Sequence, residues 1–213
     1  MKRGTKKTVK KITSTRPGAF HLIGPGGLSS KDFAVWYRME SFRQWQSLDL
    51  KAISSLAKTI EKAEKENREI FVMGNGGSAA TASHWATDFS KTAYVAGHPM
   101  IRCRCLSENI PYLTAIGNDL SFDDFFSRQL ENILNPGDLV ILISGSGNSK
   151  NLIKACRLAK KRKAQTAGIL GFDGGRLKNM VDLKIIVPSN QYGVIEDMHM
   201  AIGHILTFYL KQR

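Results

Sequence analysis

Two segments of this chain share one design, in which an apolar strand runs into a loop of small residues and then into a helix. The first joins strand 70–73 to loop 74–78, and the second joins strand 139–143 to loop 144–149. Continuous apolar runs of this kind are typical of parallel strands buried on both faces. Glycines let a ligand approach the backbone, and the free N–H groups at the start of the next helix favour an anion. The two segments therefore predict a phosphorylated small molecule bound at one edge of an α/β sheet.

Strands and helices alternate along the rest of the chain. This alternation predicts an α/β fold with a doubly wound parallel sheet flanked by helices, a flavodoxin-like three-layer sandwich. In such sheets ligands bind beyond the carboxyl ends of the strands, where the strand order reverses, and both loops follow strand ends. Two N-terminal helices precede the first strand, over 31–46 and after Asp49. The expected strands are 70–73, 101–106, 139–143, 166–170 and 183–187, and the later helices are 79–90, 110–116, 122–133, 150–162 and 194–210.

Positive charge is concentrated at the amino end of the chain. The formal net charge is +13, and seven lysines and arginines lie within the first 16 residues, without an acidic residue among them. We therefore expect residues 1–30 to form a basic, mobile tail and residues 31–213 to form a single domain that includes the N-terminal helices. A second basic cluster, from Lys154 to Lys163, falls late in a predicted helix, where cations interact favourably with the helix dipole. Since no aromatic-interleaved motif or recognition helix accompanies this charge, nucleic-acid binding is not favoured.

The sequence also predicts the cellular compartment of the protein. No apolar run approaches the ~20 residues that a membrane-spanning helix needs, and the basic amino end lacks the apolar stretch of a secretory signal. The three cysteines, Cys103, Cys105 and Cys156, show no disulfide spacing. Reduced thiols are typical of the cytoplasm. We therefore expect a cytoplasmic protein that does not enter a membrane.

Ionisable side chains gather on two of the predicted helices. His84 and Asp88 are four residues apart on the helix that begins at the first loop, so they share one face and can hold a cation or pass a proton. The last helix adds Glu196 and His204 to an otherwise apolar stripe, where polar groups are costly unless they are paired or bound. Histidine and carboxylate ligands suit zinc, and the same groups suit general acid–base catalysis. Structural hydrogen bonding at an interface is the alternative, above all for His199.

The loops carry the remaining candidates. Ser144, Ser146 and Ser149 offer hydroxyl groups to a phosphate, although turn formation and helix capping are the ordinary roles of such residues. The second loop lacks the Gly-Lys-Ser/Thr end of a Walker A motif, and the first is not Gly-x-Gly-x-x-Gly, so neither predicts a nucleotide. Asn118 and Asp119 follow a predicted helix and can bind sugar hydroxyls or form a turn.

Taken in order, these blocks resemble the SIS (sugar isomerase) domain family, and within it the phosphoheptose isomerases. The resemblance covers residues 35–210. Two carboxylate positions depart from the best-known members, which carry Glu at the position of Asp88 and Gln at that of Glu196, and Gly145 stands where a hydroxyl residue is common. The matching blocks are 74–78 with His84, Gly117-Asn118-Asp119 with 125–128, 146–149, Asp173-Gly174-Gly175, 187–189 and the helix 196–204.

The resemblance implies an aldose–ketose isomerase that converts sedoheptulose 7-phosphate into D-glycero-D-manno-heptose 7-phosphate, for activated heptose in surface polysaccharides. It implies a homotetramer whose sites are shared between subunits. Asp88 and His204 would be catalytic, and one zinc ion per site would be held by His84, Asp88, Glu196 and His204. The phosphorylated seven-carbon sugar would be bound by Asn75, Gly76, Gly77, Ser78, Asn118, Asp119, Ser144, Gly145, Ser146, Ser149 and Glu196.

The spacing of Glu196 and His204 sets a geometric condition on this metal site. Eight residues span about 12 Å of a regular helix at ~1.5 Å per residue. One metal ion therefore reaches both side chains only if Glu196 precedes the regular helix or if the two residues come from different subunits.

Three alternative functions remain. A non-catalytic SIS tetramer that binds a replication initiator protein is favoured by the basic tail and the altered carboxylates, but a pure scaffold has no need for His84, Asp88 and His204. A phosphosugar-sensing regulatory module would carry a DNA-binding domain before the SIS region, and we find none. An isomerase of another phosphosugar is the third alternative, because loops of this type select the phosphate better than the number of carbons.

Overall fold

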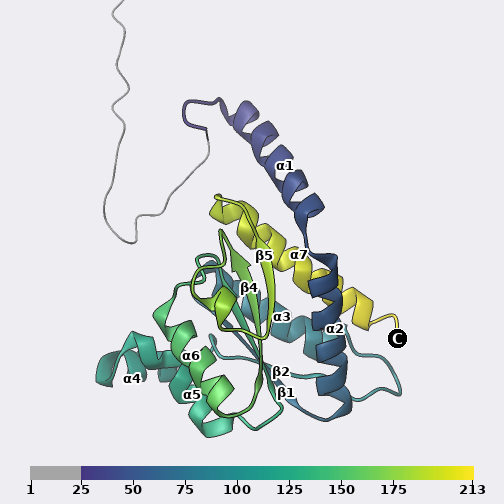
Figure 1. Cartoon of the computed structure of the whole chain (residues 1–213), viewed down its shortest axis with the longest axis vertical. Helices are drawn as coiled ribbons and strands as arrows, with labels where there is room; N and C mark the ends of the chain where they lie inside the picture. Colours follow the sequence, from purple (N-terminus) through teal and green to yellow (C-terminus); the bar gives the residue numbers. More distant parts are fainter. Residues whose placement is uncertain (1–24) are drawn as a thin grey trace, which may run out of the picture.

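The computed structural model describes residues 25–213, which form one twisted sheet with helices on both faces (Figure 1). All five strands are parallel, in the order β2-β1-β3-β4-β5. The predicted tail of residues 1–30 lies outside the described residues, except for its last six. The strands are β1 (Glu69–Gly74), β2 (Arg102–Cys105), β3 (Leu139–Ser144), β4 (Gln165–Gly171) and β5 (Leu183–Val187).

The two strands that carry the special loops are neighbours. Every residue of β3 is buried, and so is every residue of β1 except Glu69, which explains their continuous apolar runs. From β1 the chain passes to β2 on one side and then returns to β3 on the other side of β1. The strand order therefore reverses between β1 and β3, and the predicted doubly wound sheet is confirmed.

Helices cover the sheet in two layers. One apolar cluster joins α2, α3 and α7 to one face of the sheet around Trp85 and Phe89, and a second joins α5 and α6 to the other face around Phe126 and Leu130. No helix within residues 25–213 is long and apolar enough to cross a membrane. The helices are α1 (Ser30–Ser47), α2 (Leu50–Lys65), α3 (Gly77–Thr87), α4 (Ile110–Asp119), α5 (Phe125–Ile133), α6 (Lys150–Lys161) and α7 (Tyr192–Leu210).

Helix α1 projects beyond the sheet from the side that α7 covers (Figure 1). It is held by Tyr37, whose hydroxyl donates to Asp197 of α7 at 2.6 Å, and by Glu40, which accepts from Ser189 at 2.9 Å. Exposed apolar residues along one helix are typical of a protein–protein interface. The large apolar side chains that α1 exposes are Phe33, Val35, Met39, Phe42 and Trp45.

The predicted helix 79–90 differs most from the structure. The α-helix already begins at Gly77, directly after Gly76 with a φ of 55°. From Asp88 to Thr92 it gives way to a π-helical turn, closed by the N–H of Ala93, which donates to the carbonyl of Asp88 at 2.8 Å. Such turns are frequent at functional sites.

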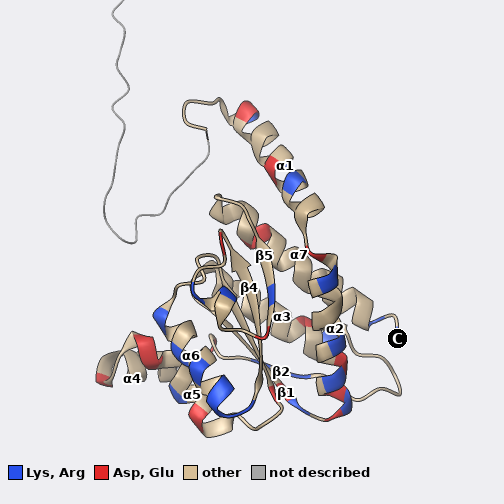
Figure 2. Cartoon of the chain, in the orientation of Figure 1, with Lys and Arg blue, Asp and Glu red and all other residues tan. Residues whose placement is uncertain are grey.

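The late basic cluster lies along α6, among acidic residues of neighbouring segments (Figure 2). Lys154 pairs with Asp124 at 2.9 Å, and Lys160 pairs with Asp182 at 2.7 Å. These half-exposed pairs show a solvated helix face whose charge is partly neutralised within the chain, which agrees with the interpretation from the sequence.

Candidate active site

A cavity of about 630 Å³ opens at the carboxyl ends of β1 and β3, where the strand order reverses. The sequence predicted a ligand at this position, and the volume suits a small molecule. The cavity brings together all of the predicted substrate-binding residues except Asn118 and Asp119. Its lining comes from the two loops, the end of β3 and the start of α7: Asn75, Gly76, Gly77, Ser78, Ile143, Ser144, Gly145, Ser146, Ser149, Tyr192 and Glu196.

The first loop places the start of α3 at the cavity. Because the helix begins at Gly77, its first N–H groups have no partner within the helix and favour an anion. Gly74 is fixed by Ser107, whose hydroxyl donates to the Gly74 carbonyl at 2.8 Å and accepts from its N–H at 3.2 Å. A Cβ on Gly74 would lie 2.6 Å from the carbonyl oxygen of Ser78. Glycine is therefore required for the tight turn that aims α3 at the cavity.

Serine hydroxyls organise the second loop. The hydroxyl oxygen of Ser144 accepts from the N–H of Gly147 at 3.0 Å, and that of Ser146 accepts from the N–H of Asn148 at 3.2 Å. Ser149 precedes α6 and makes no capping hydrogen bond with its side chain. Since a hydroxyl that accepts can still donate its own proton, the three serines can all donate to a phosphate in the cavity.

A pair of side-chain amides joins the two loops. Asn75 donates to Asn151 at 3.0 Å, and Asn151 donates back to Asn75 at 2.9 Å. Asn151 lies in the first turn of α6 and is 1% exposed. The sequence assigned Asn75 to the substrate and missed Asn151, because an asparagine at a helix start looks like an ordinary capping residue.

Tyr192 lies over Gly145, where the resemblance leads us to expect a hydroxyl side chain. A Cβ on Gly145 would lie 2.7 Å from Cε1 of Tyr192. The ring meets Phe172 edge-on with centroids 4.9 Å apart, and burial, followed by the charge of Glu196, raises the pKa of Tyr192. Sequence reasoning missed this aromatic wall. Its one signal was the glycine in place of a hydroxyl residue.

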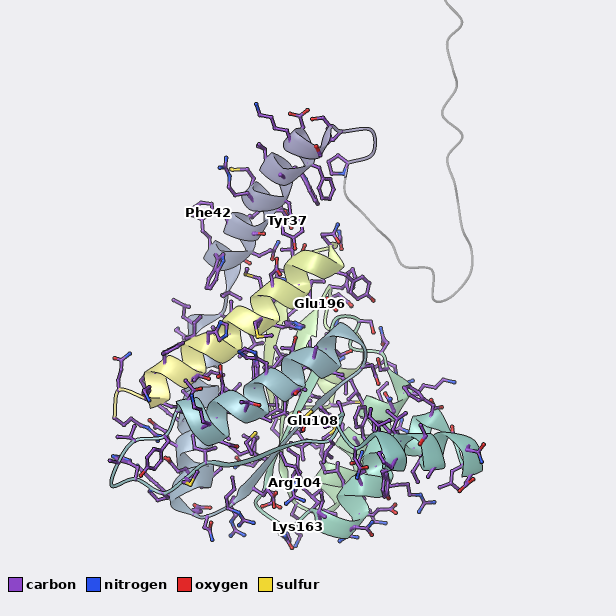
Figure 3. All side chains as sticks on the ribbon, turned by 180° about the vertical axis from the view of Figure 1, so that it is seen from behind. Tyr37, Phe42, Arg104, Glu108, Lys163 and Glu196 are labelled. Atoms are coloured by element: carbon purple, nitrogen blue, oxygen red, sulfur yellow. The ribbon has the colours of Figure 1, made fainter. Side chains whose placement is uncertain are left out.

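Glu196 lines the cavity. It lies in the second turn of α7, where Figure 3 labels it. Its carboxylate packs so closely against Gly77 that a Cβ there would overlap it. Burial, followed by the charge of Asp197, raises the pKa of Glu196. Because α7 is helical from Tyr192 onward, Glu196 does not precede the regular helix. Of the two conditions set by the sequence, only a contribution from another subunit remains for Glu196 as a metal ligand.

Three of the four predicted metal ligands meet on the outer side of α3 and α7. Nε2 of His84 lies 3.1 Å from Nε2 of His204. Oδ2 of Asp88 lies 3.3 Å from the first of these nitrogens and 3.9 Å from the second. In tetrahedral zinc sites, ligand atoms about 2.0–2.2 Å from the metal are about 3.3–3.6 Å apart. The donor set and its spacing therefore fit one zinc ion, with room for a fourth ligand.

The cavity and the cluster of His84, Asp88 and His204 lie at successive positions along the same two helices. Helices α3 and α7 lie side by side (Figure 3), with Gly77 against Glu196 at one level and His84 against His204 at the next. His84 is seven residues beyond Gly77, which is about 10 Å along a helix. The side chains of His84 and His204 are 46% and 45% exposed. The cluster is therefore open to a substrate or to a second subunit.

Asn118 and Asp119 lie apart from both features. They end α4, which has no buried residue, and the side chain of Asn118 donates to Asp119 at 2.7 Å. Helix α4 lies at the rim of the molecule, beside α5 (Figure 1). Within one chain neither residue lines the cavity, so their role in substrate binding stays a prediction that requires a second subunit.

Comparison with known proteins agrees with the fold. The SIS domain family matches residues 37–171. A phosphoheptose isomerase from a Nitratiruptor species is 42% identical over 162 residues, 76% of this chain and 86% of that protein. One from Geobacter sulfurreducens is 40% identical over 163 residues, 76% and 85% of the two chains. The solved structure of a phosphoheptose isomerase from Neisseria gonorrhoeae is similar with a TM-score of 0.80 at 28% identity, covering 87% of this chain and all of that one. The chain therefore belongs to the SIS domain family and to the phosphoheptose isomerases within it.

Proposed function

We propose that this protein is an aldose–ketose isomerase that converts sedoheptulose 7-phosphate into D-glycero-D-manno-heptose 7-phosphate. The observation that carries the proposal is the helix pair α3 and α7, which joins an anion-binding cavity to a cluster of two histidines and a carboxylate. A phosphosugar has its phosphate and its carbonyl at opposite ends, so it needs two such features at some distance. Relatives named phosphoheptose isomerase, at about 40% identity, support the choice of substrate.

The phosphate would bind between the two loops. Ser144, Ser146 and Ser149 would donate their hydroxyl protons to it, and the N–H groups at the start of α3 would add a positive dipole. Glu196 shares this cavity, where burial, followed by the charge of Asp197, raises its pKa. Binding energy gained at the phosphate holds the other end of the open-chain sugar in place for reaction.

The proton transfers would take place at the cluster. Asp88 would remove a proton from C1 of the ketose and return it to C2, so that the reaction passes through an enediol. His204 would move the second proton between the oxygens at C1 and C2. General acid–base catalysis of this kind contributes roughly 10²–10⁴-fold to the rate.

A zinc ion is the proposed cofactor, one per site. His84, Asp88 and His204 of one chain would hold it, together with Glu196 of another subunit. When bound, zinc would polarise the carbonyl group and stabilise the charge that develops on its oxygen.

A homotetramer with shared sites is the proposed assembly, in the cytoplasm. Three features support it: the exposed apolar residues of α1, the unburied α4 that carries Asn118 and Asp119, and the half-exposed histidines. The downstream product would be activated heptose for surface polysaccharide. The histidine–aspartate cluster favours this enzyme over a scaffold that binds a replication initiator.

Direct assay of the isomerisation tests the proposal. Purified protein is incubated with sedoheptulose 7-phosphate, with and without zinc, and the aldose is followed by NMR. We expect turnover that increases with zinc. No aldose in either condition would reject the function.

Two variants test which residues carry out the proton transfers. Asp88→Asn and His204→Ala should each lower kcat by roughly 10²-fold or more and leave the far-UV circular dichroism spectrum unchanged. His98→Ala changes an exposed histidine outside the site and serves as a matched control. Normal rates in the first pair would move the proton transfers to other residues.

A further inference from the structure

One side chain outside the predicted ligand set contacts Asp88. The hydroxyl of Thr92 donates to Oδ1 of Asp88 at 3.0 Å. The other carboxylate oxygen, Oδ2, is the atom that faces His84 and His204. The two oxygens of this carboxylate therefore have separate environments, one held by a hydroxyl and one turned to the imidazoles.

We propose that Thr92 is a positioning residue that holds the Asp88 carboxylate in the orientation required for metal binding. The inference rests on the metal site of the proposed function. The terminal torsion of an aspartate is broad, so the carboxylate of a free side chain samples many orientations. A hydrogen bond to one oxygen narrows that range and leaves the lone pairs of the other oxygen for a ligand. Residues that fix metal ligands in this way commonly strengthen metal binding.

The backbone fixes Thr92 as well. Thr92 is the last residue of the π-helical turn that begins at Asp88. Its carbonyl accepts from Nζ of Lys211 at 2.9 Å, and Lys211 directly follows α7, the helix of His204. Thr92 is thus tied to both elements that supply the cluster. The side chain of Asp88 is only 15% exposed, and shielding from water strengthens the hydrogen bond between them.

Zinc affinity of the metal-free protein tests this role, independently of catalysis. Thr92→Val replaces the hydroxyl by a methyl group, and Thr92→Ser keeps the hydroxyl. In competition with a chromophoric chelator, we expect Thr92→Val to raise the Kd for zinc about 10–100-fold and Thr92→Ser to stay within about threefold of wild type. Thr59→Val is the matched control, because the Thr59 hydroxyl also donates four residues back, to the carbonyl of Ser55 at 2.9 Å in α2.

The outcomes distinguish failure of the positioning role of Thr92 from failure of the proposed isomerase function. Unchanged zinc affinity in Thr92→Val, equal weakening in Thr92→Ser, or a wild-type protein that does not bind zinc would each overturn the inference. Thr92→Ala repeats the test if the valine variant does not fold. A wild-type protein that binds zinc with this dependence on Thr92, but does not isomerise sedoheptulose 7-phosphate, would reject the proposed function and keep the role of Thr92.

Discussion

At the scale of single residues, the contact between Gly145 and Tyr192 defines one wall of the cavity. A side chain at position 145 would meet the tyrosine ring, so Gly145→Ser should lower the free energy of unfolding by about 1–3 kcal/mol. In a Tyr192→Ala background the ring is absent, so Gly145→Ser should lower the free energy of unfolding far less. The difference is the coupling energy between the two substitutions, which we expect within the usual range of about 0.5–3 kcal/mol. Urea unfolding of the four proteins measures the coupling. Gly117→Ser, at a glycine with open space around it, is the control, and purely additive effects would contradict the contact.

A buried histidine gives a prediction about pH. His199 is 0% exposed, and burial lowers its pKa from 6.5 to about 4. Between these values the unfolded chain binds a proton that the folded chain does not, so stability falls as the pH falls. From pH 7 to pH 5 the loss due to this residue is about 2 kcal/mol. In urea unfolding with a chelator present, His199→Gln should lose about 2 kcal/mol less over this interval than wild type. The exposed His98→Gln should keep the wild-type dependence, and an equal dependence in both variants would show that His199 does not titrate in this way.

At the scale of secondary-structure elements, Gly203 allows α3 and α7 to pack closely. A Cβ at this position would overlap the indole of Trp85, which is 0% exposed. We therefore expect Gly203→Ala to lower the free energy of unfolding by about 1–3 kcal/mol and to weaken zinc binding, because it separates His84 from His204. Gly117→Ala, a helical glycine in open space, should instead add about 0.5–1 kcal/mol. Wild-type stability in Gly203→Ala would show that the helices can shift without cost.

The sequence predicted the helices and strands better than it predicted their boundaries or the contacts between them. Strand 183–187 agrees with β5, and α2 follows Asp49 as expected, since apolar periodicity is a local signal. The π-helical turn over 88–92 was missed, because its first residues were predicted as the end of the α-helix 79–90. The contacts of Tyr192 with Gly145 and of Asn151 with Asn75 join residues far apart in the sequence. A single sequence holds no record of such pairs, so the parts played by Tyr192 and Asn151 at the cavity could not be predicted.

At the scale of the whole molecule, the strand order decides where the site lies. The sequence predicted a reversal of the order, and the structure places it between β1 and β3, two largely apolar strands inside the sheet. The predicted site residues do not all meet within one chain. Asn118 and Asp119 lie away from the cavity, and Glu196 lies about two helical turns from His204. These gaps are of the kind that symmetry-related subunits fill.

Mixed oligomers test whether the subunits complete each other. If Glu196 of one subunit acts at the cluster of another, Glu196→Ala and His204→Ala should each be inactive alone. When the two variants are unfolded together and refolded, some interfaces will combine an intact Glu196 from one chain with an intact cluster from the other. Isomerase activity should then reappear in the mixture, but not in either variant refolded alone. If the mixture stays inactive although it forms oligomers of wild-type mass, Glu196 of one subunit does not act together with His204 of another. Glu196 would then act only in the cavity of its own chain, and the cluster would take its fourth ligand from elsewhere.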